Sequence, residues 1–269
     1  MILFPNAKIN IGLNIVRKRS DGFHNIETIF YPIGLSDILE INQAESMRFQ
    51  NTGIPVENRN PENNLCYKAY QVLKADFNLN PVSIHLHKII PFGAGVGGGS
   101  ADASFTLKML RTLNNLNLND QQLFKYAEKI GSDCAFFLLN KPAFATEKGN
   151  SLTSICLDLK GYFLVLIHPR IHISTAKAYS NITPEKPRKS LQDLIKTPIE
   201  NWKETVVNDF EKTVFAIEPE LKNIKEELYN QGAVYASMSG SGSAIYGIFK
   251  NRVDLKKHFS PYFIWTQWL

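Results

Sequence analysis

The stretch PFGAGVGGGSADAS, residues Pro91 to Ser104, places five glycines within seven positions and then continues with residues that favour a helix. Glycine costs conformational entropy on folding, so this density indicates unusual backbone conformations or a close approach to a ligand. The preceding segment VSIHLHKI, residues 82–89, alternates polar and apolar side chains as a half-buried strand does. The following segment ADASFTLKMLRTLNNL is predicted to be helical. We call residues 93–99 the glycine loop, and it connects a strand to a helix.

Two familiar nucleotide-binding loops fit this stretch poorly. Gly93, Gly95 and Gly98 satisfy the pattern G-x-G-x-x-G. A dinucleotide-binding unit also needs a second strand that ends in an acidic residue about twenty residues later, whereas the sequence there is LNNLNLNDQQ. A P-loop needs a lysine after its last glycine, whereas Gly99 is followed by serine and alanine. Both interpretations are therefore disfavoured.

The third interpretation of the glycine loop is a phosphate cradle at the start of a helix. The first N–H groups of a helix are unpaired, and the helix dipole adds partial positive charge. Glycines let phosphates approach the backbone, and Ser100 and Ser104 are expected to supply hydroxyl donors. A mobile surface loop is the alternative, but a disordered linker rarely connects a clear strand to a clear helix. We therefore predict a phosphate cradle.

Composition and charge indicate a globular protein that acts on an anionic substrate. The 269 residues suffice for one large domain or two ordinary ones, and 44% are hydrophobic. The net charge of +5 suits an anion but is too small to favour nucleic acid. Cys66, Cys134 and Cys156 form no metal or disulfide pattern, which favours a reducing compartment. With no signal-peptide pattern or membrane-spanning stretch, we expect a cytoplasmic monomer or homodimer that binds neither nucleic acid nor membrane.

Strands and helices are interspersed without a steady βαβ alternation, which favours an α+β fold with two lobes. We expect a boundary near residue 155, with an N-terminal domain at 1–155 and a C-terminal domain at 156–269. The expected elements are strands at 8–16, 82–89, 142–149 and 161–169, β-rich sequence at 26–41, a helix from Asn64, a helix capped by Asp120 and ended by Gly131, a surface connection at 181–197, helices around 202–215 and 221–229, and a strand–loop–strand at 233–249.

Three motifs resemble a known enzyme family. PFGAGVGGGSADA, residues 91–103, resembles the P-x-x-x-G-L-G-G-G-S-S-D-A phosphate loop of the GHMP kinases. AKINIGLNIVRKRSDGFHNIETIF, residues 7–30, is similar to the N-terminal motif of a member that phosphorylates a cytidine-diphosphate sugar alcohol. MSGSGSAIYGIF, residues 238–249, resembles the third family motif, and GSDCAFFL and NDFE fall in the expected order. The resemblance covers residues 5 to about 250.

This resemblance implies a two-lobed α+β kinase fold, with an N-terminal lobe like ribosomal protein S5 domain 2 and a ferredoxin-like C-terminal lobe. It also implies ATP as the phosphoryl donor, together with Mg²⁺, for which Ser100 is a candidate ligand. Asp102 either helps to hold Mg²⁺ or favours the helix N-terminus, and the second role is the more expected. The implied ATP-binding residues are Pro91, Gly93, Ala94, Gly95, Val96, Gly97, Gly98, Gly99, Ser100 and Ala101, with Lys88, Asn64 and Leu65 as weaker candidates on the adenine side.

Two residues are the implied catalytic pair. Taken alone, Lys8 reads as a solvated surface lysine and Asp133 as a helix cap. The resemblance instead makes Lys8 a cation near the transferring phosphoryl group. It makes Asp133 the carboxylate that orients the acceptor hydroxyl and accepts its proton late in the reaction.

The implied substrate residues distinguish a nucleotide-linked acceptor from a smaller alcohol such as homoserine or mevalonate. Phe23 and Tyr179 are expected to stack on the two faces of a cytosine, and His24 to contact its edge. Asn10 is expected at the sugar-alcohol end. The remaining implied substrate contacts are Thr175, Ser239 and Gly240.

Alternatives to a kinase have weaker support in the sequence. A dinucleotide-dependent oxidoreductase lacks the acidic strand end, and an RNA-binding module has little support from so mild a charge. His85 and His87 share a strand face, but without a third ligand they read as solvated histidines rather than as a metal pair.

Overall fold

The computed structural model describes residues 1–55, 61–180 and 182–269, which divide into two compact units. Unit 1 comprises Met1–Ala7, Gly34–Phe92 and Gly97–Lys141, and unit 2 comprises Lys8–Ile33, Gly93–Val96 and Pro142–Leu269. A single cut near residue 155 does not reproduce this partition, because β3 (His24–Ser36) pairs with β7 (Ala143–Thr146) far along the chain. The division into domains 1–155 and 156–269 stays a prediction.

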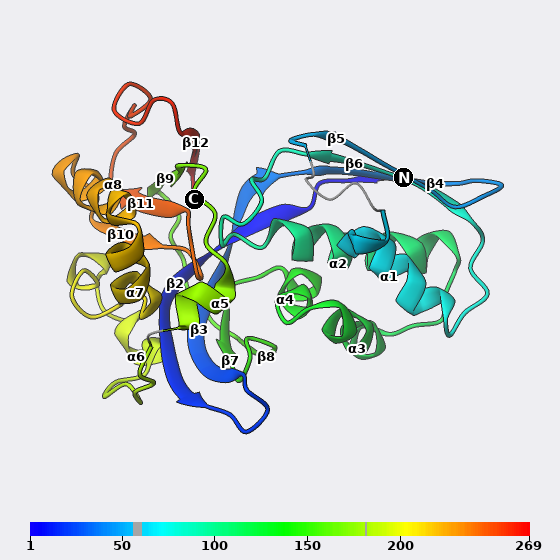
Figure 1. Cartoon of the computed structure of the whole chain (residues 1–269), viewed down its shortest axis with the longest axis horizontal. Helices are drawn as coiled ribbons and strands as arrows, with labels where there is room; N and C mark the ends of the chain where they lie inside the picture. Colours follow the sequence, from blue (N-terminus) through cyan, green and yellow to red (C-terminus); the bar gives the residue numbers. More distant parts are fainter. Residues whose placement is uncertain (56–60, 181) are drawn as a thin grey trace. The chain divides into compact units, whose positions relative to one another are not determined.

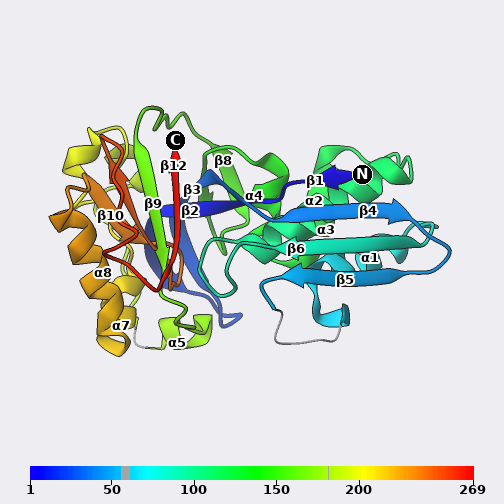
Figure 2. The same ribbon diagram turned by 90° about the horizontal axis from the view of Figure 1, so that it is seen from above.

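Unit 1 contains a four-stranded sheet. Its order is β1 (Ile2–Leu3), β4 (Ile38–Gln43), β6 (Val82–Lys88) and β5 (Arg48–Gly53), with β5 parallel to β6 and the other pairs antiparallel. The alternation in β6 buries Val82, Ile84 and Leu86 on one face and leaves the residues between them half-buried. The strand expected before the glycine loop is therefore confirmed, and Figure 2 shows it between β4 and β5.

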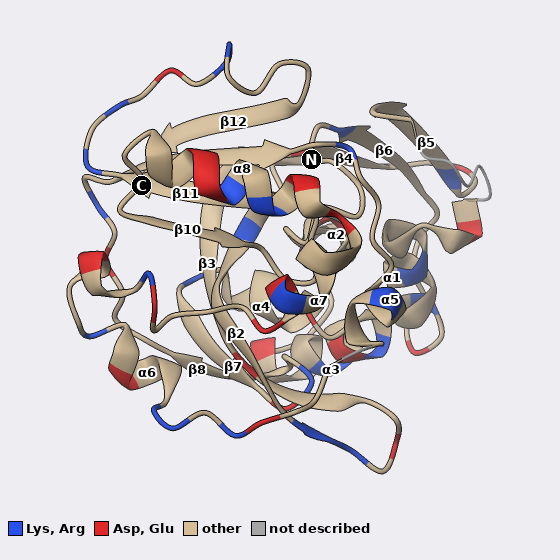
Figure 3. Cartoon of the chain, turned by 60° about the vertical axis from the view of Figure 1, so that its left-hand side comes forward, with Lys and Arg blue, Asp and Glu red and all other residues tan. Residues whose placement is uncertain are grey.

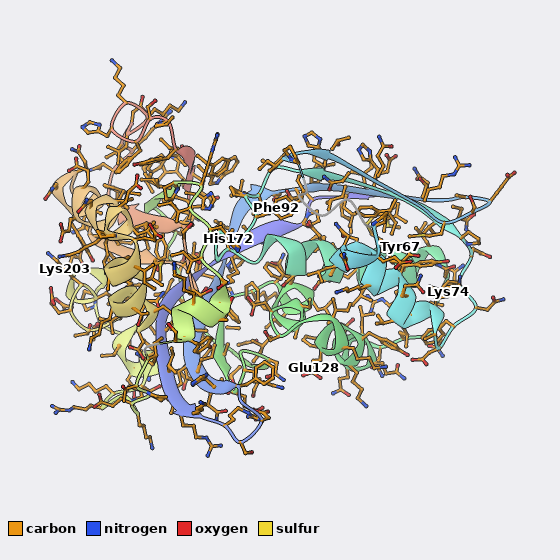
Figure 4. The ribbon with its side chains drawn as sticks, in the orientation of Figure 1. Tyr67, Lys74, Phe92, Glu128, His172 and Lys203 are labelled. Atoms are coloured by element: carbon orange, nitrogen blue, oxygen red, sulfur yellow. The ribbon has the colours of Figure 1, made fainter. Side chains whose placement is uncertain are left out.

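The helices of unit 1 lie on one side of this sheet, as Figure 1 shows. They are η1 (Pro61–Asn63), α1 (Leu65–Lys74), α2 (Gly98–Leu113), α3 (Asp120–Ile130) and α4 (Cys134–Leu139). On α1, Cys66 and Leu73 are buried in the core, whereas Lys74, which Figure 4 labels, is exposed. The predicted helix from Asn64 is therefore confirmed as α1, with its apolar stripe facing the rest of the unit.

The start of α3 corrects one expectation. Asn119, not Asp120, is the N-cap residue, and its side chain accepts a hydrogen bond of 2.9 Å from the Gln122 N–H. The Gln122 side chain in turn accepts one of 2.9 Å from the Asn119 N–H, so the two residues form a capping box. The predicted end at Gly131 is confirmed.

Unit 2 contains two four-stranded sheets. One has the order β2 (Asn6–Lys18), β3, β7 and β8 (Ser151–Ser154). The other is antiparallel, in the order β10 (Tyr235–Met238), β11 (Ile245–Phe249), β9 (Phe163–His168) and β12 (Phe263–Trp268). The strands expected at 8–16, 161–169 and 233–249 are confirmed, and the C-terminal aromatic tail forms β12.

Two helices, α7 (Phe210–Ile217) and α8 (Pro219–Asn230), pack together, and α8 also packs on β10 and β11. The helix predicted around 202–215 begins later than expected, because residues 202–209 form turns and the short η2 (Ile199–Asn201) precedes them. The connection expected at 181–197 includes α6 (Leu191–Leu194), whose Leu191 is fully buried, so it is not wholly a surface segment. Residue 181 lies outside the described residues.

His168, the last residue of β9, is buried, and its burial predicts that the fold loses stability in acid. It is 5% exposed, and neither ring nitrogen has a hydrogen-bond partner among the described residues. Burial, reinforced by the Arg170 charge, lowers the pKa of His168 to about 4. An unfolded histidine titrates near pH 6.5, so stability should begin to fall below that pH and continue falling to about pH 4.

Urea unfolding at pH 7 and pH 5 tests this expectation. The wild-type protein should lose about 2 kcal/mol more of its unfolding free energy over this range than His168→Leu. Equal losses would show that His168 does not titrate on unfolding.

The α+β class is confirmed by these sheets and helices. Within the residues that the structure describes, no helix has the length and apolar character needed to cross a membrane.

Candidate active site

Lys8 is buried in unit 2, with 3% of its surface exposed. Its Nζ donates to the Gly95 carbonyl at 2.9 Å and to Asn10 Oδ1, and it lies 5.0 Å from the centroid of the Phe30 ring. Its backbone N–H donates to the Val96 carbonyl at 3.0 Å. A solvated surface lysine is therefore excluded, and Lys8 holds the first half of the glycine loop from both its backbone and its ammonium group.

Asn10 lies two residues along β2 and is also buried. Its Nδ2 donates to Thr28 Oγ1 at 2.9 Å, and its backbone N–H donates to Ser239 Oγ at 3.2 Å. Its carbonyl accepts from the Tyr246 hydroxyl at 2.8 Å. Asn10 thus fixes the Lys8 ammonium within the protein, and its expected contact with the substrate stays a prediction.

The loop of the third motif contacts the first half of the glycine loop within unit 2. Ser239 Oγ donates to the Gly95 carbonyl at 2.9 Å, and Gly95 has a φ of +74°. A Cβ at Gly95 would lie 2.0 Å from the Ser239 carbonyl oxygen, so only glycine fits there. Gly240 also lies close to Gly95, since a Cβ added at Gly240 would be 3.1 Å from the Gly95 carbonyl oxygen. The predicted residues Gly95, Ser239 and Gly240 are therefore in direct contact.

Two more hydrogen bonds extend this contact. Ser243 N–H donates to the Gly93 carbonyl at 3.2 Å, and Ala244 N–H donates to the Ala94 carbonyl at 3.1 Å. Behind Gly93 lies His172, labelled in Figure 4, whose Nδ1 would be 2.5 Å from a Cβ added at that glycine. The first half of the glycine loop is thus paired along its length.

The second half of the glycine loop starts α2 in unit 1. Gly97 is the N-cap residue with a φ of +74°, and the helix begins at Gly98, three residues earlier than the sequence predicts. Glycine has no side chain to cap the first N–H groups, which leaves the helix N-terminus suited to an anion. The Ser104 hydroxyl, however, lies 2.7 Å from both the Ser100 and the Cys134 carbonyl oxygens, which take its one donor, and Ser104 is fully buried. The expectation that Ser104 supplies a phosphate donor is therefore wrong.

Lys88, at the end of β6, is at the centre of a buried ionic cluster. Its Nζ lies 2.9 Å from Asp102 Oδ2 on α2 and also pairs with Asp37 Oδ2. Asp37 Oδ1 accepts from the N–H groups of Ile89 and Ile90 at 2.6 and 2.8 Å. The Lys88 ammonium is therefore engaged by carboxylates, so its predicted role in ATP binding would fall to its backbone atoms.

The charges of this cluster shift one another's protonation. Burial raises the pKa of Asp102, the Lys88 ammonium opposes this effect, and the neighbouring Asp37 carboxylate reinforces it. Burial alone would lower the pKa of Lys88, but the carboxylates of Asp102 and Asp37 outweigh it and raise that pKa. Asp102 therefore pairs with Lys88. Neither of its two expected roles, holding Mg²⁺ or favouring the helix N-terminus, includes this pairing.

Asn64 and Leu65, the weaker adenine-side candidates, lie at the start of α1 in unit 1. Asn64 is the N-cap residue, and its Oδ1 accepts from the Cys66 N–H at 2.8 Å. Leu65 Cδ1 would lie 3.5 Å from a Cβ added at Gly99. The structure therefore brings Leu65 and the second half of the glycine loop together.

Two substitutions separate capping by Asn64 from nucleotide binding. Asn64→Ala should lower the unfolding free energy by about 1 kcal/mol, because the cap is lost. Asn64→Asp should retain the cap and the melting temperature but raise the KM for ATP, because the amide donor is lost. If Asn64→Asp leaves both quantities unchanged, Asn64 is only a cap, and the adenine contact is disproved.

Asp133 lies at the N-cap position of α4 in unit 1 and is half-buried. Its side chain makes no capping hydrogen bond to α4, so the simple cap reading is not supported. The next residue, Cys134, is a poor nucleophile because burial raises the pKa of its thiol to about 11. Asp133 and Lys8 belong to different units.

Two of the three predicted base-recognition residues, His24 at the start of β3 and Tyr179, are in contact in unit 2. The His24 ring stacks on the Tyr179 ring with centroids 4.5 Å apart and planes 13° apart, and Tyr179 also packs edge-on against Phe210. Burial, aided by the Lys18 charge, lowers the pKa of His24, so its imidazole is neutral at pH 7. Phe23 is 60% exposed and does not take part in this stack, and its ring lies under the Lys148 ammonium at 5.0 Å.

Tyr179 and Thr175 are the two ends of α5 (Thr175–Tyr179), which Ser174 caps. Thr175 Oγ1 lies 3.5 Å from the Ser241 hydroxyl in the third motif. The short helix α5 thus carries two predicted substrate residues and connects one of them to the loop that contacts Gly95.

His85 and His87 are half-buried rather than fully solvated. Both rings lie 2.9 Å from the Thr52 hydroxyl on β5. Across the described ranges, no group of three His, Cys, Asp or Glu residues could hold a metal ion. The two histidines therefore help to connect β6 to β5 in the sheet of unit 1 through Thr52.

Sequence reasoning missed several residues that support these sites. Asp37 lies 51 positions from Lys88, and no local pattern signals such a pairing. Thr28 and Tyr246 fix Asn10 from other strands. The motif NDFE resembles a family motif in the sequence, but the sequence does not show which residues it contacts.

Comparisons with known proteins identify the class of this fold and site. Residues 64–141 match the GHMP kinases N terminal domain, and residues 190–258 match the GHMP kinases C terminal domain. The chain belongs to the GHMP kinases, and the expected two-lobed kinase fold is confirmed.

Two relatives and one solved structure point to one particular kinase within this family. The chain is 56% identical to the 4-diphosphocytidyl-2-C-methyl-D-erythritol kinase of Azobacteroides pseudotrichonymphae, over 93% of this chain and 94% of the relative. It is 49% identical to the kinase of the same name from Parabacteroides distasonis, over 98% of each. A crystal structure of 4-(cytidine 5'-diphospho)-2C-methyl-D-erythritol kinase superposes with a TM-score of 0.80 at 28% identity, covering 99% of this chain and 98% of that one.

Proposed function

We propose that the protein transfers the γ-phosphoryl group of ATP to a hydroxyl of 4-diphosphocytidyl-2-C-methyl-D-erythritol, a step in the non-mevalonate route to isoprenoid precursors. The observation that carries this proposal is the near-complete alignment with relatives of that name at about half identity. The cytidine diphosphate group is anionic, in keeping with the net charge of +5. We propose a cytoplasmic location and a monomer or homodimer.

ATP is the donor in this reaction, and its phosphates would lie on the glycine loop. Gly97 leaves the first turn of α2 without a side-chain cap, and Gly95 leaves no room for a Cβ. Ser100 in that first turn is the candidate protein ligand of a Mg²⁺ ion bound to ATP. When bound, Mg²⁺ would neutralise charge on the phosphates. Because Mg²⁺ in such sites is usually held by one or two protein groups together with substrate phosphates, ATP would supply further ligands.

Lys8 and Asp133 would perform the chemistry on the acceptor hydroxyl. The buried Lys8 ammonium would stabilise negative charge on the transferring phosphoryl group, and its bond to the Gly95 carbonyl fixes where that charge is placed. Asp133 would orient the hydroxyl. A carboxylate is too weak to deprotonate a free alcohol, so the proton would reach Asp133 only as the new bond to phosphorus forms.

Recognition of the cytosine would fall to His24, Tyr179 and Phe23. The stacked rings of His24 and Tyr179 provide a flat aromatic surface, and neutral His24 offers both a donor and an acceptor for the edge of a base. Exposed Phe23 is available for a further stacking contact. A smaller alcohol such as homoserine or mevalonate has no base for these residues to bind.

A coupled assay of ADP release tests the choice of acceptor. The purified protein should release ADP with 4-diphosphocytidyl-2-C-methyl-D-erythritol and far more slowly with homoserine or mevalonate. ADP release with homoserine or mevalonate alone would instead support the alternative, a GHMP kinase for a small alcohol.

A further inference from the structure

The motif NDFE, residues 208–211, lies at the start of α7 and is not explained by substrate or nucleotide binding. Asn208 is 3% exposed, and its Nδ2 donates to the Met238 and Gly240 carbonyls at 2.8 Å each. Its Oδ1 accepts from the Phe210 N–H at 3.0 Å. An asparagine amide has two N–H donors, and here both are used on one loop, that of the third motif.

Glu211 holds the same loop from the next turn. Its Oε1 accepts from the Met238 N–H at 2.8 Å and from the Ser237 hydroxyl at 3.1 Å. Its Oε2 lies 2.6 Å from Lys225 Nζ on α8, a helix along which Figure 3 shows acidic and basic residues side by side. The N–H and carbonyl groups of Met238 are thus bound by two different side chains of the motif, which fixes the orientation of the loop that follows.

This loop leads directly to the lysine proposed for catalysis. The Gly95 carbonyl accepts two hydrogen bonds of 2.9 Å, one from Ser239 Oγ and one from Lys8 Nζ. The two backbones are also close together, because a Cβ added at Gly95 would lie 2.0 Å from the Ser239 carbonyl oxygen. The position of Gly95, and with it that of the Lys8 ammonium, therefore depends on how the loop is held.

We propose that Asn208 and Glu211 are positioning residues for phosphoryl transfer, acting through Ser239 and Gly95 on Lys8. This inference rests on the proposed function, because it assigns Lys8 a role in that reaction. All of these residues belong to unit 2. A misplacement of about 1 Å in a reacting group can cost about 10²-fold in rate, so a loop that is merely loosened should lower kcat without unfolding the protein.

Asn208→Asp tests the proposal. It keeps the side-chain shape but replaces both N–H donors with an oxygen that faces two carbonyls. We expect kcat to fall about 10²-fold with a much smaller change in the KM for ATP. Asn230→Asp is the matched control, because Asn230 is exposed on α8 and its Nδ2 contacts only Glu227 at 3.2 Å among the described side chains. This control should retain the wild-type kcat.

Ser239→Ala provides a second readout that does not depend on the folding of Asn208→Asp. It removes the hydroxyl that donates to Gly95 and accepts from the Asn10 N–H, and kcat should fall about 10-fold or more, the effect expected from these lost hydrogen bonds. The double variant should be no slower than the slower single variant, because both act through one contact. Wild-type kcat in both single variants, or multiplicative losses in the double variant, would overturn the proposal.

The same experiment separates this inference from the proposed function. If wild-type protein phosphorylates homoserine or mevalonate instead of the cytidine substrate, the proposed function fails, and the variants are compared on the alcohol that is accepted. If wild-type protein is active but the variants match it, only the positioning role fails.

Discussion

Replacing Asp133 by asparagine should abolish turnover while leaving ATP binding nearly intact. Asparagine keeps the shape of the side chain but cannot accept the proton of the acceptor hydroxyl, so kcat should fall by about 10³-fold or more. The fold should survive, because asparagine has nearly the same size and shape and the side chain is only half-buried. Steady-state ADP release measures kcat, and equilibrium binding of a non-hydrolysable ATP analogue measures affinity.

Asp120→Asn is the matched control in unit 1. Asp120 begins α3, and its side chain is 82% exposed while pairing with Arg111 at 2.7 Å. An exposed ion pair contributes little, so this variant should keep both turnover and ATP binding. Equal loss of turnover and ATP binding in Asp133→Asn would show that Asp133 is a structural residue.

Replacing Gly95 by alanine should disrupt both the fold of unit 2 and activity. The new Cβ would lie 2.0 Å from the Ser239 carbonyl oxygen, on a backbone whose φ of +74° disfavours any side chain. Since backbone rather than a flexible side chain blocks the space, we expect a loss of about 3 kcal/mol or more in unfolding free energy. Urea unfolding measures this loss, and kcat should fall with it because Lys8 contacts the Gly95 carbonyl.

Gly99→Ala is the matched control for folding. Gly99 is helical, and a Cβ there would meet only Leu65 Cδ1, at an ordinary contact distance of 3.5 Å. Alanine is better than glycine within a helix by about 1 kcal/mol, so this variant should be at least as stable as the wild type. A Gly95→Ala protein with wild-type stability would contradict the contact between Gly95 and Ser239.

Local patterns predicted much of the secondary structure because those signals lie within a few residues of one another. The alternation in β6 is of this kind, whereas α2 begins at Gly98, three residues before the start that the sequence predicts. The sequence places the cap of α3 at Asp120, one residue late, although the capping-box spacing from Asn119 to Gln122 is present and identifies Asn119.

Long-range pairings were beyond the reach of such patterns. Ser239 and Gly95 are 144 positions apart, and Asp37 is 51 positions from Lys88. The resemblance placed Lys8, Gly95 and Ser239 in one function, but only the structure shows that the Gly95 carbonyl joins the other two. The discontinuous units arise in the same way, because strands such as β3 and β7 pair across more than a hundred intervening residues.

The most direct measurement follows the phosphoryl group itself. The protein would be incubated with Mg²⁺, ATP labelled at the γ-phosphorus and 4-diphosphocytidyl-2-C-methyl-D-erythritol, and the products separated and weighed by mass spectrometry. We predict that the label appears in the cytidine compound, whose mass increases by one phosphoryl group, with one ADP formed for each transfer. An unlabelled cytidine compound in the presence of ATP turnover with homoserine or mevalonate would contradict the proposed reaction.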